Sequence, residues 1–236
     1  MKEYQLNYYF SYLNDFPYKE IWEHATYPWE ALANVTKFVD HLVVEPNKKE
    51  NLAHTGEFVS LTGNYIIGEN TEIGANVCIE GPVIIGRNCT IRPGALIRPY
   101  SVIGDNCVVG HGCEVKHSIV QNKAKVQSLT FIGNSIIGKS TRIGSGTILG
   151  NRRFDQANIM VKTEHGKIDT GMDFFGAIIG DETRLGANCT TTPGTFIGPH
   201  TWILPATSVR GFIPKETKIL PVQNTIVQEN EMIELN

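Results

Sequence analysis

An aliphatic residue recurs every six positions through most of this 236-residue chain, and that period limits the folds open to it. The series has 21 repeat starts, with two five-residue steps and one interruption, and the second position is Gly in twelve of them. The starts are Ile67, Ile73, Ile79, Ile85, Ile91, Ile97, Ile103, Val109, Val115, Val120, Val126, Ile132, Ile137, Ile143, Leu149, Ile179, Leu185, Thr191, Ile197, Ile203 and Val209. An α-helix, with about 3.6 residues per turn, cannot keep a period of six on one face.

A triangular coil fits this period, because three sides of six residues each point one aliphatic side chain inward. The fifth position of the repeat is mostly small or β-branched, which indicates a second inward-facing position in a narrow interior. We interpret the cysteines at this position as small apolar filling rather than redox centres or metal ligands; they are Cys89, Cys107, Cys113 and Cys189. The sequence thus predicts an all-β, single-stranded parallel β-helix of about seven coils, about 34 Å long.

The composition divides the chain into three parts. Residues 1–60 hold most of the tyrosines and two of the three tryptophans, and we expect a small N-terminal helical extension there. Within it, residues 28–42 carry an apolar stripe at helical spacing, so this helix should cover the first coil or a neighbouring subunit, with a lid over a substrate as the alternative. Residues 61–212 should form the β-helix, with residues 151–176 as an ejected hairpin loop, and residues 213–236 should form a C-terminal tail.

Charge and hydropathy exclude several classes of partner. The net charge of −3 predicts no general attraction for nucleic acid or for an anionic membrane. No segment approaches the roughly 18 apolar residues of a membrane span, and residues 1–5 do not open a signal peptide, so we expect a cytoplasmic protein. Without a CxxC pair or a zinc-finger spacing, we expect no metal.

Several motifs resemble the acetyltransferase half of bifunctional N-acetylglucosamine-1-phosphate uridyltransferase/glucosamine-1-phosphate acetyltransferases, the archaeal forms most of all. They are Ile97-Arg98-Pro99-Tyr100, Glu114-Val115-Lys116, Leu129-Thr130-Phe131-Ile132-Gly133-Asn134, Gly144-Ser145-Gly146-Thr147, Asn151 and Arg153-Phe154-Asp155. The resemblance implies a left-handed β-helix, a homotrimer, and acetyl-CoA bound in the groove between neighbouring prisms beside the sugar phosphate. No GxGTR-type nucleotide loop precedes the repeat, so we expect no uridyltransferase domain.

In that family a basic pair binds the phosphate of the sugar, and the matching residues here are Arg98 and Lys116. Their spacing supports the assignment independently, because residues 18 apart project from the same face of adjacent coils, roughly 5 Å from each other. Two cations this close repel one another unless an anion bridges them. A solvated surface is the alternative reading of the pair.

Other positions match the family's sugar and donor sites. Asn151 and Lys162 match polar positions near the sugar and the donor. Acetyl-CoA is expected to lie against Ser145, Ala187 and Pro205, with backbone amides near Ser145 polarising the thioester carbonyl.

Three positions depart from the family. Its catalytic histidine aligns with Ser128, a neighbouring tyrosine with Phe131, and a sugar-contacting asparagine with Arg142. A serine hydroxyl does not act as a base near neutral pH without help. His117 and His165 are therefore replacement candidates for the base, as is His111, and the alternative reading of each is a surface histidine. A zinc site of the carbonic anhydrase type needs three histidines from neighbouring protomers, and none lies one or two coils before His111.

These features predict an acetyl-CoA-dependent acyltransferase that acts on a sugar phosphate or a nucleotide sugar through an altered acceptor site. The alternative is a catalytically inactive protein of the same fold. Such a protein would bind the sugar phosphate or nucleotide sugar, serve as a scaffold, or pair with a separate nucleotidyltransferase. The three altered positions favour binding, whereas the basic pair and the inserted loop favour catalysis.

Overall fold

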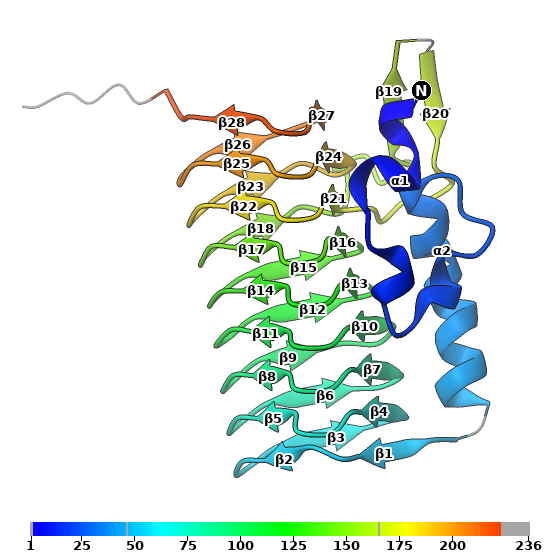
Figure 1. Ribbon diagram of the computed structural model, residues 1–236, viewed down its shortest axis with the longest axis vertical. Helices are drawn as coiled ribbons and strands as arrows, with labels where there is room; N and C mark the ends of the chain where they lie inside the picture. Colours follow the sequence, from blue (N-terminus) through cyan, green and yellow to red (C-terminus); the bar gives the residue numbers. More distant parts are fainter. Residues whose placement is uncertain (1, 46, 165, 223–236) are drawn as a thin grey trace, which may run out of the picture.

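A computed structural model describes residues 2–45, 47–164 and 166–222, and it shows a left-handed parallel β-helix with its coils stacked along the long axis (Figure 1). Three parallel sheets run the length of the prism, and we call them faces A, B and C. Face A contains β1 (Lys49–Asn51), β4 (Tyr65–Ile67), β7 (Val83–Ile85), β10 (Ser101–Ile103), β13 (Ile119–Val120), β16 (Ile136–Ile137), β21 (Ala177–Ile179), β24 (Thr195–Ile197) and β27 (Phe212–Ile213).

The other two faces follow the same order of coils. Face B contains β2 (His54–Thr55), β5 (Glu72–Ile73), β8 (Thr90–Ile91), β11 (Val108–Val109), β14 (Lys125–Val126), β17 (Arg142–Ile143), β22 (Arg184–Leu185), β25 (Trp202–Ile203) and β28 (Lys218–Ile219). Face C contains β3 (Ser60–Thr62), β6 (Cys78–Glu80), β9 (Leu96–Ile97), β12 (Glu114–Lys116), β15 (Phe131–Gly133), β18 (Ile148–Leu149), β23 (Thr190–Thr191) and β26 (Ser208–Val209).

The interior columns confirm the register predicted from the repeat. Ile67 pairs with Ile85 and Ile85 pairs with Ile103 in adjacent strands, and all three side chains are fully buried. The four cysteines at the fifth position are buried in the same core as reduced residues, and their thiols hydrogen-bond to backbone carbonyls of the next coil. These cysteines therefore fill space in the interior, as predicted.

The β-helix has about nine coils, not the seven expected from the repeat count. Strands β1 and β2 precede residue 61, and β28 follows residue 212, so the coils extend beyond the expected range at both ends. The step from Val209 to Ile213 is four residues, which hides the last coil from a search at a period of six. The first coil has a neighbour on one side only, so Asn51 and Thr55 can occupy positions that are aliphatic in the next coil.

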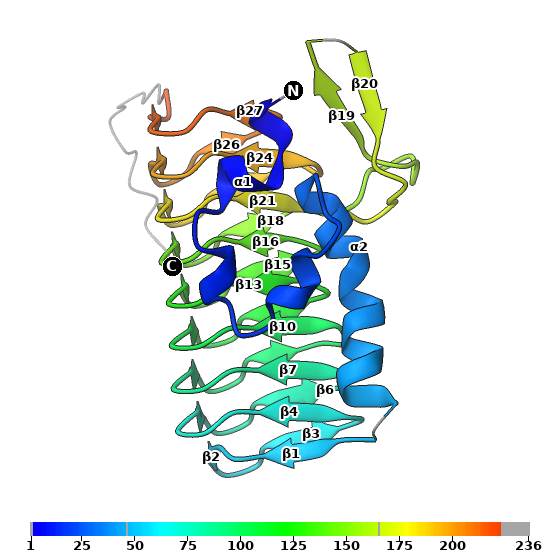
Figure 2. The same ribbon diagram turned by 45° about the vertical axis from the view of Figure 1, so that its right-hand side comes forward.

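The N-terminal segment covers face A and does not close the open end of the first coil (Figure 2). It contains η1 (Lys2–Tyr4), α1 (Leu6–Tyr9), η2 (Leu13–Asp15), η3 (Lys19–Trp22), α2 (Pro28–Val39) and η4 (Asp40–Val44). The buried stripe of α2 packs on the outward side chains of face A; the residues in contact include Trp29, Leu32, Val35, Val39, Ile84, Val102, Ile119, Ile136, Ile178 and Phe196. Face A needs this cover because its outward positions are apolar.

Asp181 fixes the N-terminal segment to the upper coils. Its carboxylate accepts hydrogen bonds from the backbone N–H of Ser11 at 2.7 Å and of Lys139 at 2.8 Å, and its own N–H donates to the carbonyl of Tyr9. Burial raises the pKa of this carboxyl to about 6, although the two N–H donors oppose the shift. The carboxylate therefore joins the segment to the prism at a buried point.

The interruption of the repeat forms the expected hairpin, with β19 (Met160–Thr163) antiparallel to β20 (Gly166–Asp169). Its base packs on the chain's own N-terminal segment through Ile159, Val161 and Phe175, and the Tyr4 hydroxyl donates to the carbonyl of Lys162. The hairpin itself projects beyond the coils (Figure 1). None of the helices in the described ranges is long and apolar enough to cross a membrane.

Candidate functional site

Arg98 and Lys116 lie on face C, on adjacent coils, as their spacing predicted. Arg98 is held by carboxylates: its Nη1 donates to Glu114 Oε1 at 2.8 Å, and its Nε lies 3.8 Å from Glu80 Oε2. Those carboxylates relieve the repulsion between the two cations, so the closeness of the pair does not by itself require a bound anion. Glu80, Arg98 and Lys116 occupy the same repeat position in three successive coils, and this spacing of 18 could have identified Glu80 from the sequence.

The Lys116 ammonium has a different environment. Its Nζ lies 5.0 Å from the centroid of the Phe174 ring, and the guanidinium of Arg152 lies 4.6 Å from the same ring. Among the described residues, no carboxylate oxygen lies within 4.0 Å of this ammonium, and the side chain is half-buried. Within the described ranges Lys116 is therefore a cation without a charged partner, positioned by an aromatic ring from the inserted loop.

Phe131 and Asn151 lie beside this cation on face C. Asn151 Nδ2 donates a hydrogen bond to Asn134 Oδ1 at 2.8 Å. Phe131 is the first residue of β15, the strand that pairs with β12, which contains Lys116. The end of the Phe131 ring and Asn151 Nδ2 both approach Gly133, where an added Cβ would lie 2.7 Å and 2.5 Å from them. The structure therefore brings Arg98, Lys116, Phe131 and Asn151 together on face C.

Ser128 lies at the edge between faces B and C, and Arg142 lies beside it on face B. Both line a hollow of about 350 Å³, together with Arg92, Lys125 and Gln127. Within the described part of the chain, no group hydrogen-bonds to the Ser128 hydroxyl. No base among the residues that the structure describes is therefore bonded to this serine hydroxyl.

The three positions matched to the donor site form one line along the edge between faces B and C. Ser145, Ala187 and Pro205 stand in the turns that follow β17, β22 and β25, in successive coils. The coils are tightly stacked there, since a Cβ on Gly144 would lie 2.5 Å from the backbone nitrogen of Ala187. The three positions therefore follow one another directly along this edge.

His117 does not face this site. The centroid of its ring lies 5.7 Å from that of the Tyr100 ring, and the ring contacts the backbone of Leu32 on α2. Burial lowers the pKa of His117, with a smaller contribution from the charge of Lys116. The imidazole is therefore biased to the neutral form, but it lies under α2 at the edge of face A.

Of the remaining candidates, His111 stands at the same edge as Ser128, one coil earlier, whereas Lys162 lies elsewhere. His111 is exposed, with its Nδ1 at 2.7 Å from the carbonyl of Pro93. Lys162 lies on the hairpin and lines a different hollow, with Tyr4 and Arg210. His165 lies outside the described residues. Among the residues that are described, no group of three or more His, Cys, Asp or Glu could hold a metal ion.

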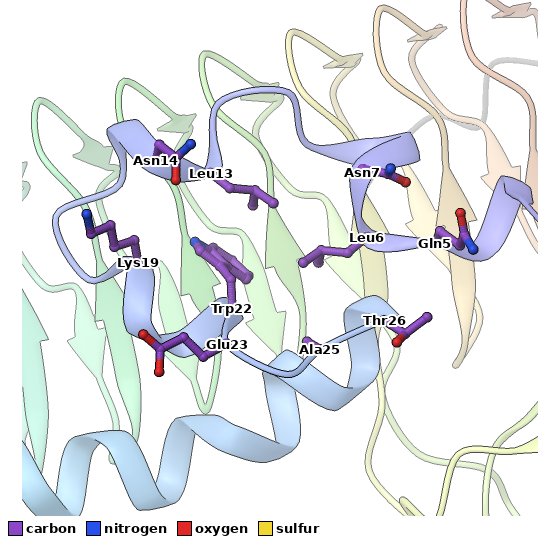
Figure 3. A pocket seen from close by; sticks show the side chains of 10 residues that line it. All are labelled: Gln5, Leu6, Asn7, Leu13, Asn14, Lys19, Trp22, Glu23, Ala25 and Thr26. Carbon is purple, nitrogen blue, oxygen red and sulfur yellow. The ribbon is translucent and has the colours of Figure 1, made fainter.

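A further hollow, of about 610 Å³, lies in the N-terminal segment (Figure 3). The described residues that line it include none of the positions matched to the family site; they are Gln5, Leu6, Asn7, Leu13, Asn14, Lys19, Trp22, Glu23, Ala25 and Thr26. This hollow is therefore separate from the candidate site.

Comparison with known proteins identifies the family of this chain. The model of the GMPPB C-terminal domain matches residues 79–172, and that of the hexapeptide repeat of succinyl-transferase matches residues 176–199. The uncharacterized acetyltransferase YaiX of Escherichia coli is 36% identical over 155 residues, which are 66% of this chain and 67% of YaiX. The chain belongs to the hexapeptide-repeat acyltransferase family.

Two longer relatives are described as bifunctional. The sugar-1-phosphate nucleotidylyltransferase/acetyltransferase of Sulfurisphaera tokodaii is 34% identical over 193 residues, 81% of this chain and 47% of that protein. The bifunctional protein GlmU of Methanococcus maripaludis is 43% identical over 183 residues, 77% of this chain and 43% of that protein. This hexapeptide-repeat acyltransferase chain thus spans about half the length of these curated relatives.

Proposed function

We propose that this protein transfers an acetyl group from acetyl-CoA to a sugar phosphate or a nucleotide sugar. The observation that carries the proposal is the cluster on face C, where Lys116 has no charged partner in the part of the chain that the structure describes and lies beside Arg98, Phe131 and Asn151. The line formed by Ser145, Ala187 and Pro205 supports a site for the donor. The amine or hydroxyl of the acceptor would attack the thioester carbonyl, lose its proton and release the CoA thiol.

The alternative proposal is a protein of the same fold that binds the acceptor without acetylating it. Ser128 and Phe131 support it, because they replace the family's histidine and tyrosine and because no base contacts the Ser128 hydroxyl among the described residues. An assay with acetyl-CoA and a panel of amino-sugar phosphates and nucleotide-linked amino sugars separates the two. Release of free CoA thiol together with an acetylated product supports transfer, whereas acceptor binding without either product supports the alternative.

Lys116→Ala is expected to weaken sugar-phosphate binding by about 1.5–3 kcal/mol, the range for hydrogen bonds to charged groups. The loss should shrink as salt rises, because the side chain is only half-buried. Titration calorimetry with glucosamine 1-phosphate at two ionic strengths measures both effects. Lys37→Ala, an exposed lysine on α2 over face A, is the matched control. Equal binding by Lys116→Ala and the parent protein would identify the pair as a solvated surface.

We also propose that the protein is a homotrimer, as the family resemblance implies. Exposed apolar side chains support it: Leu129 is 62% exposed, Ile148 is 43% exposed and Phe154 in the inserted loop is fully exposed. With face A covered by the N-terminal segment, faces B and C are the ones open to a neighbour. Sedimentation at micromolar concentration should give three times the chain mass of 26.2 kDa, and a clean monomer would remove the proposed donor groove.

A further inference from the structure

Face B carries three cations in direct register. Lys125 on β14 pairs with Arg142 on β17, and Arg142 pairs with Arg184 on β22, and all three side chains are exposed. We call this row the basic ladder. Neighbouring strands lie about 4.8 Å apart, so the ladder extends over roughly 10 Å of the face.

The basic ladder lacks the neutralising groups that Arg98 has on face C. Among the described residues, no carboxylate oxygen lies within 4.0 Å of its three cationic groups. The Arg184 guanidinium donates to the backbone carbonyls of Ser140 and Thr183, which orients it without cancelling its charge. Like charges in adjacent strands destabilise a sheet. An unneutralised row of this kind is therefore a strong candidate for binding a multiply charged anion.

The surroundings of the basic ladder indicate what else the anion carries. Trp202 on β25 pairs with Arg184 and is 56% exposed, so an aromatic face continues the row in the next coil. Hollows of about 330 Å³ and 350 Å³ flank the row, and Lys123 lines the first while Ser128 lines the second. Phosphates bind to Arg and Lys, and nucleobases stack on exposed tryptophan.

We propose that the basic ladder binds the diphosphate of a nucleotide sugar, with the base on Trp202, the phosphates at Arg184 and Arg142, and the sugar in the hollow lined by Ser128. This deepens the proposed function and rests on its acetyl transfer, because it assigns the acceptor as a nucleoside diphosphate sugar, whose phosphates bind at the ladder, in place of a sugar monophosphate bound at Arg98 and Lys116. A single phosphate is too short to contact all three cationic side chains of the ladder and the tryptophan. In the proposed trimer, the ladder would form one wall of the acceptor groove.

The test is titration calorimetry on the full-length protein with UDP, GDP and inorganic pyrophosphate. Arg184→Gln and Arg142→Gln should each weaken the binding of the preferred nucleotide about 10-fold or more, as expected for a lost charge-assisted hydrogen bond. Trp202→Ala should weaken nucleotide binding about 5-fold or more and leave pyrophosphate binding unchanged, because pyrophosphate has no base to stack. Lys37→Gln removes the same charge from the far side of the molecule and should change neither.

The outcomes separate this inference from the proposed function. If Arg184→Gln and Arg142→Gln bind nucleotides as tightly as the parent, the inference is wrong, even if the protein acetylates a sugar monophosphate. Ladder-dependent nucleotide binding without transfer to any acceptor would support the inference and contradict the function. CoA also contains a nucleoside diphosphate, so a competition with saturating CoA completes the design. If CoA displaces the nucleotide, and if Arg184→Gln weakens the binding of both equally, the ladder belongs to the donor site. This result would overturn the acceptor assignment.

Discussion

Ile103→Asp is expected to leave the chain unfolded. Ile103 is fully buried and stacks between Ile85 and Val120 in the interior column of face A. An unpaired carboxylate there meets only aliphatic side chains, and its burial costs several kcal/mol even if it becomes protonated. That cost is comparable with the roughly 5–15 kcal/mol that stabilises a typical domain. Far-UV circular dichroism and urea unfolding measure the result.

Two control variants separate charge from position. Ile103→Val removes one methylene from the same column and should cost only about 0.5–1.5 kcal/mol. Leu52→Asp places the same carboxylate between β1 and β2 of the first coil, where the side chain is 50% exposed, and should preserve the fold. A folded Ile103→Asp protein with the unfolding midpoint of the parent would show that the interior column is assigned to the wrong residues.

Restoring the family's base and hydroxyl together, by Ser128→His and Phe131→Tyr, should create or raise acetylation of glucosamine 1-phosphate by about 10²–10⁴-fold. A histidine at 128 would enter the hollow that also holds Arg142. A tyrosine hydroxyl at 131 would extend from the ring end that already approaches Gly133 and Asn151. Release of free CoA thiol by the parent and the double variant, at equal protein concentration, measures the gain.

The two single variants are the matched controls for this gain. Ser128→His alone should show most of it, since proton removal is the step that the parent lacks, and Phe131→Tyr alone should show little. Brisk acetylation of glucosamine 1-phosphate by the unmodified protein would contradict the interpretation of Ser128 as a lost base. No activity in the double variant would place the defect elsewhere in the acceptor site, with Arg142 as the next position to change.

The interior of the β-helix could be predicted because each inward position obeys a strict period, as Ile67, Ile85 and Ile103 show. The end coils do not follow this period, because their inward positions are less demanding and because the step from Val209 to Ile213 breaks it. The sequence does carry a signal for the cover on face A. Strands of that face carry two adjacent aliphatic residues, such as Ile84 with Ile85, and the outer one needs a partner.

The candidate site was predictable where it depends on the coils and not where it depends on a loop. The juxtaposition of Arg98 and Lys116 follows from their spacing of 18, and the same spacing leads to Glu80. The ring of Phe174 under the Lys116 ammonium has no such signal, because tertiary packing sets the path of the inserted loop. His117 illustrates the same limit, since only the docked helix α2 shows that its ring is covered.

The cover on face A also has a consequence for the order of folding. Residues 4–9 precede the coils in the chain, yet they pack on the last of them: Tyr4 and Tyr8 contact the Phe212 ring, and the Tyr8 hydroxyl accepts a hydrogen bond from the backbone N–H of Lys215. Closing a loop of some 200 residues is slow compared with stacking one coil on the next. During synthesis, residues 4–9 therefore lack these packing partners until the last coils have been made.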